Sequence, residues 1–208
     1  MKRIYASILN CDLLAIGAEI ERLVAAGIKR LHLDLMDGAV TGKIFLGEEI
    51  VKQIGERFPE LEIECHLMVQ NPLNCIKNLE LSRLSHVIVH TNPQMAEVAQ
   101  YMKMHGGKLG VAISPGEVLD KLYIPETASK ILIMGVVPGR GGQKMLSCTT
   151  ERLREAKDKY ADVVFGVDGG VNLETIVDVI SADDFVLGSC LFNSDTTEVC
   201  DKIREILQ

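Results

Sequence analysis

The sequence predicts an α/β protein in which eight parallel strands close into a (β/α)8 barrel. Short apolar, β-branched runs alternate with helical patterns along the whole chain, and eight such units fit into 208 residues. Strictly alternating units are typical of a parallel sheet that is buried on both faces. No linker, low-complexity segment or shift in composition marks a boundary. We therefore expect residues 1–208 to form a single barrel domain.

The predicted strands are short apolar segments separated by helical patterns and loops. They cover residues 4–9, 30–36, 62–69, 86–90, 108–113, 130–136, 163–167 and 184–187. None is expected to run antiparallel to its neighbours, which favours a closed barrel over an open doubly wound sheet.

Capping residues and helical spacing predict the connecting helices. Asp12 caps a first helix that buries Leu13 and Leu14 together with the apolar residues of its later turns, and Gly27 ends it. Pro72 suits the first turn of the third helix. The remaining helices are predicted over residues 48–57, 93–104, 117–123, 149–160, 173–180 and 196–207.

Composition and charge exclude several classes of partner. The net charge of −7 argues against nucleic acid and anionic membranes. It does not exclude a small anionic substrate, because backbone amides bind phosphate without net positive charge. The six cysteines form no CxxC pair and are typical of reduced thiols in a cytoplasmic protein. We expect no signal peptide, and no apolar run approaches the roughly 18 residues that span a bilayer.

Four polar residues stand at or near the ends of three predicted strands: His32, Asp34, His66 and Asp168. In a parallel barrel these ends meet at one mouth, where active sites lie. Any one of them could equally be a core histidine or a helix cap. Together they would be costly to bury without compensation, which a divalent cation provides most directly. This donor set suits zinc, ferrous iron, cobalt or manganese, and the two carboxylates could also serve as acid and base.

Glycine-rich loops follow the last three predicted strands. Their candidate phosphate-binding residues are Gly139, Arg140, Gly141, Gly142, Gly169, Gly170, Gly188 and Ser189. Glycines let backbone N–H groups surround an anion, and barrel phosphate sites typically use the loops after strands seven and eight. Tight turns also need glycine, so one loop alone would mean little. Arg140 either adds an anion contact or is a solvated loop residue, and we slightly favour the second interpretation.

Three methionines, Met36, Met68 and Met134, end the second, third and sixth predicted strands. Core filling is the commoner role of methionine. Their grouping also suggests a floor without hydrogen-bonding groups, on which a planar enediolate could form with water excluded.

Seven motifs in order carry a resemblance to a known family. They are residues 6–9 (ASIL), 32–38 (HLDLMDG), 66–68 (HLM), 89–90 (VH), Met134 with 138–143 (PGRGGQ), 167–172 (VDGGVN) and 188–189 (GS). Over nearly its whole length the chain resembles the ribulose-phosphate 3-epimerase family. The resemblance implies a TIM barrel of the ribulose-phosphate-binding type. It also implies a metal-dependent reaction that interconverts D-ribulose 5-phosphate and D-xylulose 5-phosphate through an enediolate.

The resemblance also implies roles for individual residues. His32, Asp34, His66 and Asp168 would bind one divalent metal ion, and Asp34 and Asp168 would exchange protons with the substrate. Ser7, His66 and the three methionines would lie near the sugar. The glycine loops and Ser189 would hold the phosphate of a small phosphorylated ketose.

Two loops depart from the family's pattern. Residues 39–45 replace an aromatic-containing stretch that usually ends in Pro-Asn, and Val137-Pro138-Gly139-Arg140 replaces the usual Asn-Pro-Gly-Phe. Another ketose phosphate, such as D-allulose 6-phosphate, is therefore an alternative substrate.

Two other classes are less favoured. Phosphate-barrel decarboxylases and lyases carry an Asp-x-Lys-x-x-Asp motif, and residues 32–37 contain no lysine. A non-catalytic sugar-phosphate binder would not need both Asp34 and Asp168. A homo-oligomer is possible, and the sequence identifies no interface.

Overall fold

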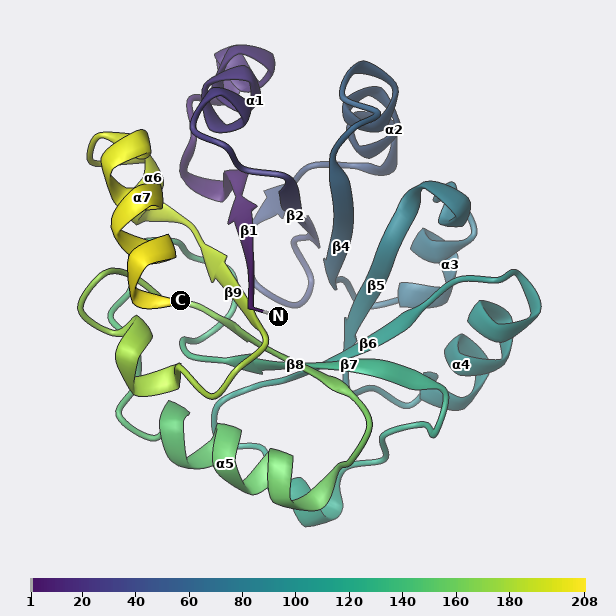
Figure 1. Cartoon of the computed structure of the whole chain (residues 1–208). Coiled ribbons are helices and arrows are strands. Elements are labelled where there is room, and N and C mark those ends of the chain that lie inside the picture. Colours follow the sequence, from purple (N-terminus) through teal and green to yellow (C-terminus); the bar gives the residue numbers. More distant parts are fainter. Residues whose placement is uncertain (1) are drawn as a thin grey trace.

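Eight parallel strands surround a common axis, and the helices lie outside them (Figure 1). The structure is a computed structural model that describes residues 2–208. The barrel strands are β1 (Arg3–Ser7), β2 (Arg30–Asp37), β4 (Glu62–Met68), β5 (Leu84–His90), β6 (Leu109–Ile113), β7 (Ala128–Met134), β8 (Val164–Asp168) and β9 (Asp184–Leu187). β1 pairs in parallel with both β9 and β2, which closes the ring. The predicted (β/α)8 barrel is therefore confirmed.

The helices follow the strands in chain order. They are α1 (Ile16–Ala25), α2 (Glu48–Arg57), α3 (Pro72–Ile76), α4 (Met95–Met104), α5 (Thr149–Lys159), α6 (Ser189–Phe192) and α7 (Thr196–Ile206). From residue 2 to the end of the chain, none of them has both the length and the apolar character that a membrane crossing requires.

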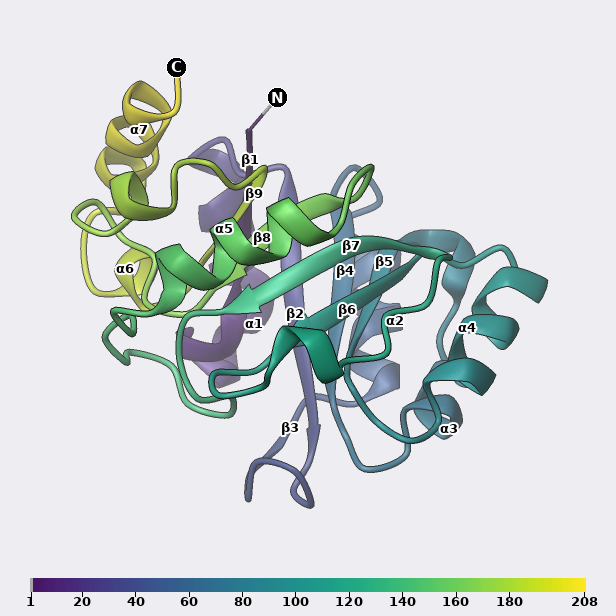
Figure 2. The same cartoon turned by 90° about the horizontal axis from the view of Figure 1, so that it is seen from below.

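The expectation of a sheet without antiparallel strands is wrong at one place. The short strand β3 (Ile44–Phe45) runs antiparallel to the end of β2, with Met36 opposite Phe45. Gly38 adopts a φ of 86° as the chain leaves β2, a conformation that favours glycine. Figure 2 shows this hairpin projecting from the molecule on the side opposite the two termini. The hairpin extends one barrel strand and leaves the ring of eight intact.

The start of the first βα unit also differs from the prediction. β1 ends at Ser7, where the serine side chain caps a short 3₁₀ turn over Ile8–Asn10. Asp12 accepts a hydrogen bond from the Leu14 N–H at 3.0 Å, but this cap starts a second 3₁₀ turn and α1 begins only at Ile16. The expected burial of Leu13 and Leu14 is wrong, since they are 51% and 99% exposed.

Two further helical expectations are corrected, and one short helix was not expected. Residues 117–123 and 173–180 contain 3₁₀ turns at Leu119–Lys121 and Ile176–Val179, not α-helices. The one-turn helix α6 was not predicted, because four residues are too few to show a helical period.

The barrel separates two apolar clusters. The large cluster lies between the strands and the surrounding helices. The small one comes from alternate positions on the strands and fills the barrel interior with Tyr5, Ile88, Ala112, Leu132, Met134 and Val186. The interior also holds three fully buried charged side chains, those of Glu64, Lys130 and Asp184. Gly166 makes room for them, because a Cβ there would lie 2.9 Å from Leu132 Cδ1 and 3.2 Å from Lys130 Cε.

Two glycine-to-alanine changes should alter the stability in opposite directions. Gly166→Ala overpacks the interior and should lower the free energy of unfolding by about 1–3 kcal/mol. Gly55→Ala places its Cβ in ordinary contact, 3.8 Å from Arg83 Cδ and Ile63 Cδ1, inside α2. It should raise the free energy of unfolding by about 0.5–1 kcal/mol. Urea denaturation measures both, and a Gly166→Ala protein as stable as the parent would contradict the packing argument.

Candidate functional site

Four side chains meet at the carboxyl end of the barrel: His32, Asp34, His66 and Asp168. Each offers one donor atom, and these atoms all lie within 4.8 Å of one another. Strand register explains the convergence. Asp34 on β2 stands beside His66 on β4, and Asp168 ends β8. The four residues that the sequence analysis selected as metal ligands are therefore brought together.

The distances fit a divalent metal ion. His32 Nε2 lies 3.2 Å from His66 Nδ1 and 3.4 Å from Asp34 Oδ1. His66 Nδ1 lies 3.1 Å from Asp34 Oδ1 and 3.7 Å from Asp168 Oδ2. Ligands about 2.1 Å from a tetrahedral ion lie about 3.4 Å from each other, so the observed spacings suit such an ion. The donor set is one that zinc and related ions accept.

A chain of buried charges runs from this cluster towards the amino end of the barrel. His32 Nδ1 lies 2.7 Å from Glu64 Oε1, and the other carboxylate oxygen of Glu64 contacts the Lys130 ammonium. Lys130 Nζ also lies 2.8 Å from Asp184 Oδ2, and the Arg3 guanidinium binds both oxygens of Asp184. We call this series, from His32 through Glu64, Lys130 and Asp184 to Arg3, the charge chain.

The pKa values of the charge chain follow from these contacts. Burial alone would lower the pKa of His32, but the attraction of Asp34 and the contact with Glu64 outweigh it and raise the value to about 10. Burial would raise the pKa of Glu64, but Lys130 and His32 outweigh it and lower the value to about 2. The carboxylates of Asp34 and Glu64 therefore stabilise a positive charge on His32.

The two candidate catalytic carboxyl groups differ in ionisation. Burial would raise the pKa of Asp34, but its contacts with His32 and His66 lower the value well below the ordinary range. Burial raises the pKa of Asp168. The attraction of His32 lowers it, but the negative charge of Asp34 raises it further, and the net shift is an increase. The pKa values of the two carboxyl groups are thus shifted in opposite directions, which favours Asp34 as the proton acceptor and Asp168 as the proton donor.

His66 has a second set of partners on its other ring nitrogen. His66 Nε2 lies 2.9 Å from His90 Nε2, and His90 Nδ1 lies 3.0 Å from Ser114 Oγ. Burial, together with the neighbouring His66, lowers the pKa of His90 to about 3, so His90 is neutral. A neutral imidazole can accept the proton of His66 Nε2 while its own Nδ1–H donates to Ser114.

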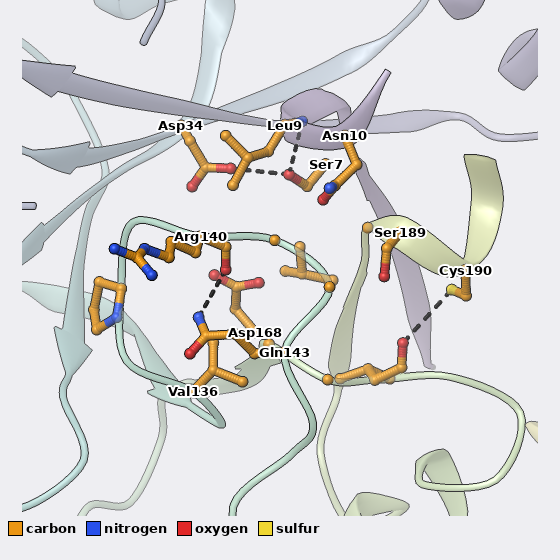
Figure 3. A pocket seen from close by; sticks show the side chains of 18 of the residues that line it. Ser7, Leu9, Asn10, Asp34, Val136, Arg140, Gln143, Asp168, Ser189 and Cys190 are labelled. Carbon is orange, nitrogen blue, oxygen red and sulfur yellow. Dashed lines mark hydrogen bonds between the residues drawn. The ribbon is translucent and has the colours of Figure 1, made fainter. Parts of the chain in front are cut away.

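A cavity of about 230 Å³ opens beside Asp34 and Asp168. All eight predicted phosphate-binding residues line it, as do Ser7, Met68 and Met134. In Figure 3 the two carboxylates face the same space, with Ser7 beside Asp34 and Ser189 on another side of the pocket. Gly170 has a φ of 72°, and a Cβ there would lie 2.3 Å from the Met145 backbone nitrogen, so this loop needs glycine.

Two of the predicted substrate-binding residues do not line this cavity. Met36 is buried and its sulfur lies 3.4 Å from Thr41 Oγ1. His66 is fully buried among the other ligand residues. Ser7, in contrast, reaches the cavity and its hydroxyl donates to Asp34 Oδ2 at 2.9 Å.

Sequence reasoning missed the part of the charge chain that lies beyond His32. Glu64 lies two positions before His66 on the same strand, so alternation alone puts both on the same side. Lys130 is the one charged residue of β7 and precedes four apolar residues, so its charge was a candidate for burial and pairing. Both signals could have been found, but neither identifies the partner, because Lys130 and Glu64 are 66 residues apart.

Fold and site together define the class: a (β/α)8-barrel enzyme with two imidazoles and two carboxylates at the carboxyl end of its strands. The chain matches the model of the ribulose-phosphate 3-epimerase family over residues 3–192. It therefore belongs to this family and is an isomerase that acts on carbohydrates.

Individual relatives agree with the family match. The ribulose-phosphate 3-epimerase of Encephalitozoon cuniculi is 34% identical over 194 residues, which cover 93% of this chain and 89% of the relative. The cytoplasmic isoform of ribulose-phosphate 3-epimerase from Oryza sativa is 29% identical over 216 residues, which cover 99% and 94%. The crystal structure of 3-hexulose-6-phosphate synthase from Salmonella typhimurium has a TM-score of 0.73 at 15% identity, with 99% and 98% covered, and supports the fold alone.

Zinc binding should release protons at neutral pH. The contacts of His32 with Asp34 and Glu64 raise its pKa to about 10, and an imidazolium cannot coordinate a metal. Below that pH each bound ion displaces the His32 proton, so the apparent zinc affinity should rise about tenfold per pH unit for each proton released. Calorimetry in buffers of different ionisation enthalpy counts the protons. Release of fewer than one per ion would contradict this electrostatic account, and His105→Gln, at an exposed imidazole, should leave the count unchanged.

Proposed function

We propose that the protein is a metal-dependent 3-epimerase that interconverts D-ribulose 5-phosphate and D-xylulose 5-phosphate. The observation that carries the proposal is the pair Asp34 and Asp168, two carboxyl groups of opposite pKa shift that face one cavity. Epimerisation beside a ketone needs one group to remove the C3 proton and another to return a proton on the opposite face. The names of the relatives support the choice of a pentose phosphate.

The two carboxyl groups can complete the reaction without a net change of protons. The ionised Asp34 takes the C3 proton, and the electron pair of the C–H bond moves into the enediolate. Asp168 then donates its proton to the opposite face of C3, so each carboxyl group ends in the state in which the other began. The reverse reaction uses the same two groups with their roles exchanged, as an enzyme working in both directions requires.

The four donor residues support a role for a divalent cation. His32, Asp34, His66 and Asp168 would hold it, and when bound it would stabilise the negative charge that develops on the substrate oxygen. Zinc, ferrous iron, cobalt and manganese all suit two imidazoles and two carboxylates.

The rest of the cavity suits a phosphorylated sugar. The glycine loops after β7, β8 and β9 leave backbone groups accessible on one side of the carboxylates. We place the phosphate there, with Ser189 and the glycines as its partners. Ser7, Met68 and Met134 would contact the sugar, and the sulfur-containing side chains would exclude water from the enediolate.

A cytoplasmic location is part of this proposal. The six cysteines are unpaired, as in a reducing compartment. The Oryza sativa relative is named as a cytoplasmic isoform.

Asparagine at either position should strongly impair epimerisation at C3. Asp34→Asn removes the base and Asp168→Asn removes the acid, and each loss should slow the conversion of D-ribulose 5-phosphate to D-xylulose 5-phosphate at least ~10²-fold. NMR with D-ribulose 5-phosphate measures the conversion, with bound zinc recorded for each variant. The matched control is Asp195→Asn at the start of α7, where asparagine caps a helix as well as aspartate does. Conversion at the parent rate in both variants would refute the two-carboxylate mechanism.

The parent protein should turn over D-ribulose 5-phosphate faster than D-allulose 6-phosphate. The hexose phosphate is one carbon longer, and the cavity places the glycine loops directly beside the carboxylates. Both sugars are assayed at equal concentration with the same metal. An equal or reversed preference in kcat/KM would reject the pentose assignment and leave the 3-epimerase chemistry in place.

A further inference from the structure

We propose that Glu64 is a positioning residue for the metal centre. Glu64 holds the His32 ring with Nδ1 protonated and Nε2 facing the ion. The inference rests on the metal site proposed above. It adds a residue outside the four donors and assigns a specific ring nitrogen to each histidine.

The geometry around His32 leaves one arrangement of its ring. Glu64 and His32 are fully buried, and Glu64 Oε1 lies 2.7 Å from His32 Nδ1. A carboxylate only accepts hydrogen bonds, so Nδ1 carries the proton. The other nitrogen, Nε2, is then the one that faces Asp34 Oδ1 at 3.4 Å and Asp168 Oδ2 at 3.8 Å.

Lys130 fixes the orientation of the Glu64 carboxylate. Its fully buried ammonium contacts Glu64 Oε2, lies 2.8 Å from Asp184 Oδ2 and stands 4.3 Å from the centre of the Tyr5 ring. Each oxygen of Glu64 therefore has its own partner, His32 on one side and Lys130 on the other. If the Glu64 carboxylate turned away from His32, the buried Lys130 ammonium would lose its contact with Glu64, which is costly.

The two histidines face the metal position with different ring nitrogens, so each needs its own partner to hold it. His66 uses Nδ1, and His90 stands 2.9 Å from its Nε2. His32 uses Nε2, and Glu64 is the group on its Nδ1. Partners of this kind typically change metal affinity 10- to 100-fold when they are removed.

Two double variants isolate the acceptor at position 64. Glu64→Gln/Lys130→Met and Glu64→Leu/Lys130→Met both remove the buried ion pair and leave Asp184 with Arg3. Only the first keeps an oxygen that can accept from His32 Nδ1. Chelator competition should show zinc affinity within a few-fold of the parent for the glutamine variant. For the leucine variant we expect a loss of about 10- to 100-fold.

The neighbouring glutamate gives a matched control. Glu62 lies two positions earlier on β4 and points to the same side, but its oxygens bind Tyr5 Oη at 2.6 Å and Arg30 Nε at 2.9 Å. Glu62→Gln should leave the zinc affinity unchanged. A leucine variant that binds zinc as tightly as the parent would overturn the role of Glu64.

A measurement on the parent protein decides the question even where a variant fails to fold. With ¹¹³Cd as the metal and ¹⁵N-labelled histidine, coupling to cadmium is expected at Nε2 of His32 and at Nδ1 of His66, with a bound proton on His32 Nδ1. Coupling at His32 Nδ1 would overturn the inference while leaving the metal site intact. A parent protein that binds neither zinc nor cadmium would refute the proposed metal site itself, and the role of Glu64 with it.

Discussion

The site depends on how charge is balanced inside the barrel. A closed parallel barrel has an interior without bulk water, where an unpaired carboxylate is costly. This barrel nevertheless places Glu64 and Asp184 in its interior, and Asp34 and Asp168 at its mouth. Lys130 and Arg3 compensate the inner pair. At the mouth, His32 Nε2 lies 3.4 Å from Asp34 Oδ1 and 3.8 Å from Asp168 Oδ2, and a divalent cation would add positive charge beside both carboxyl groups.

Strand alternation and register connect this balance to the catalytic geometry. On β2 and β4 the polar residues stand two apart, so His32, Asp34, Glu64 and His66 all point inward. The parallel register sets His32 beside Glu64 and Asp34 beside His66. Ser7 on β1 is in register with His32 and reaches Asp34. A shift of one residue in either strand would turn these side chains towards the helices, and the charge chain and the metal ligands would be lost together.

Patterns repeated along the chain were predictable, and contacts distant in sequence were not. The eight strands follow from alternation of apolar runs, and the four ligand residues from their places at strand ends. The antiparallel β3 and the four-residue α6 are too short to give a period. Leu13 and Leu14 fit a helical face, but the Asp12 cap starts a 3₁₀ turn that leaves them in solvent. The partnership of Lys130 with Glu64 and Asp184 depends on barrel closure, which no local pattern specifies.

The difference between Asp34 and Asp168 also follows from where each residue lies on its strand. Asp34 is inside β2, three positions before its end, with a side chain 5% exposed and contacts to both ligand histidines and to Ser7. Asp168 is the last residue of β8, with a side chain 16% exposed beside the Gly169–Gly170 turn. More partners stabilise the anion of Asp34, and that anion in turn raises the pKa of Asp168. Asp34 and Asp168 therefore differ in proton affinity although both are aspartates. This difference allows one of them to accept a proton while the other donates one.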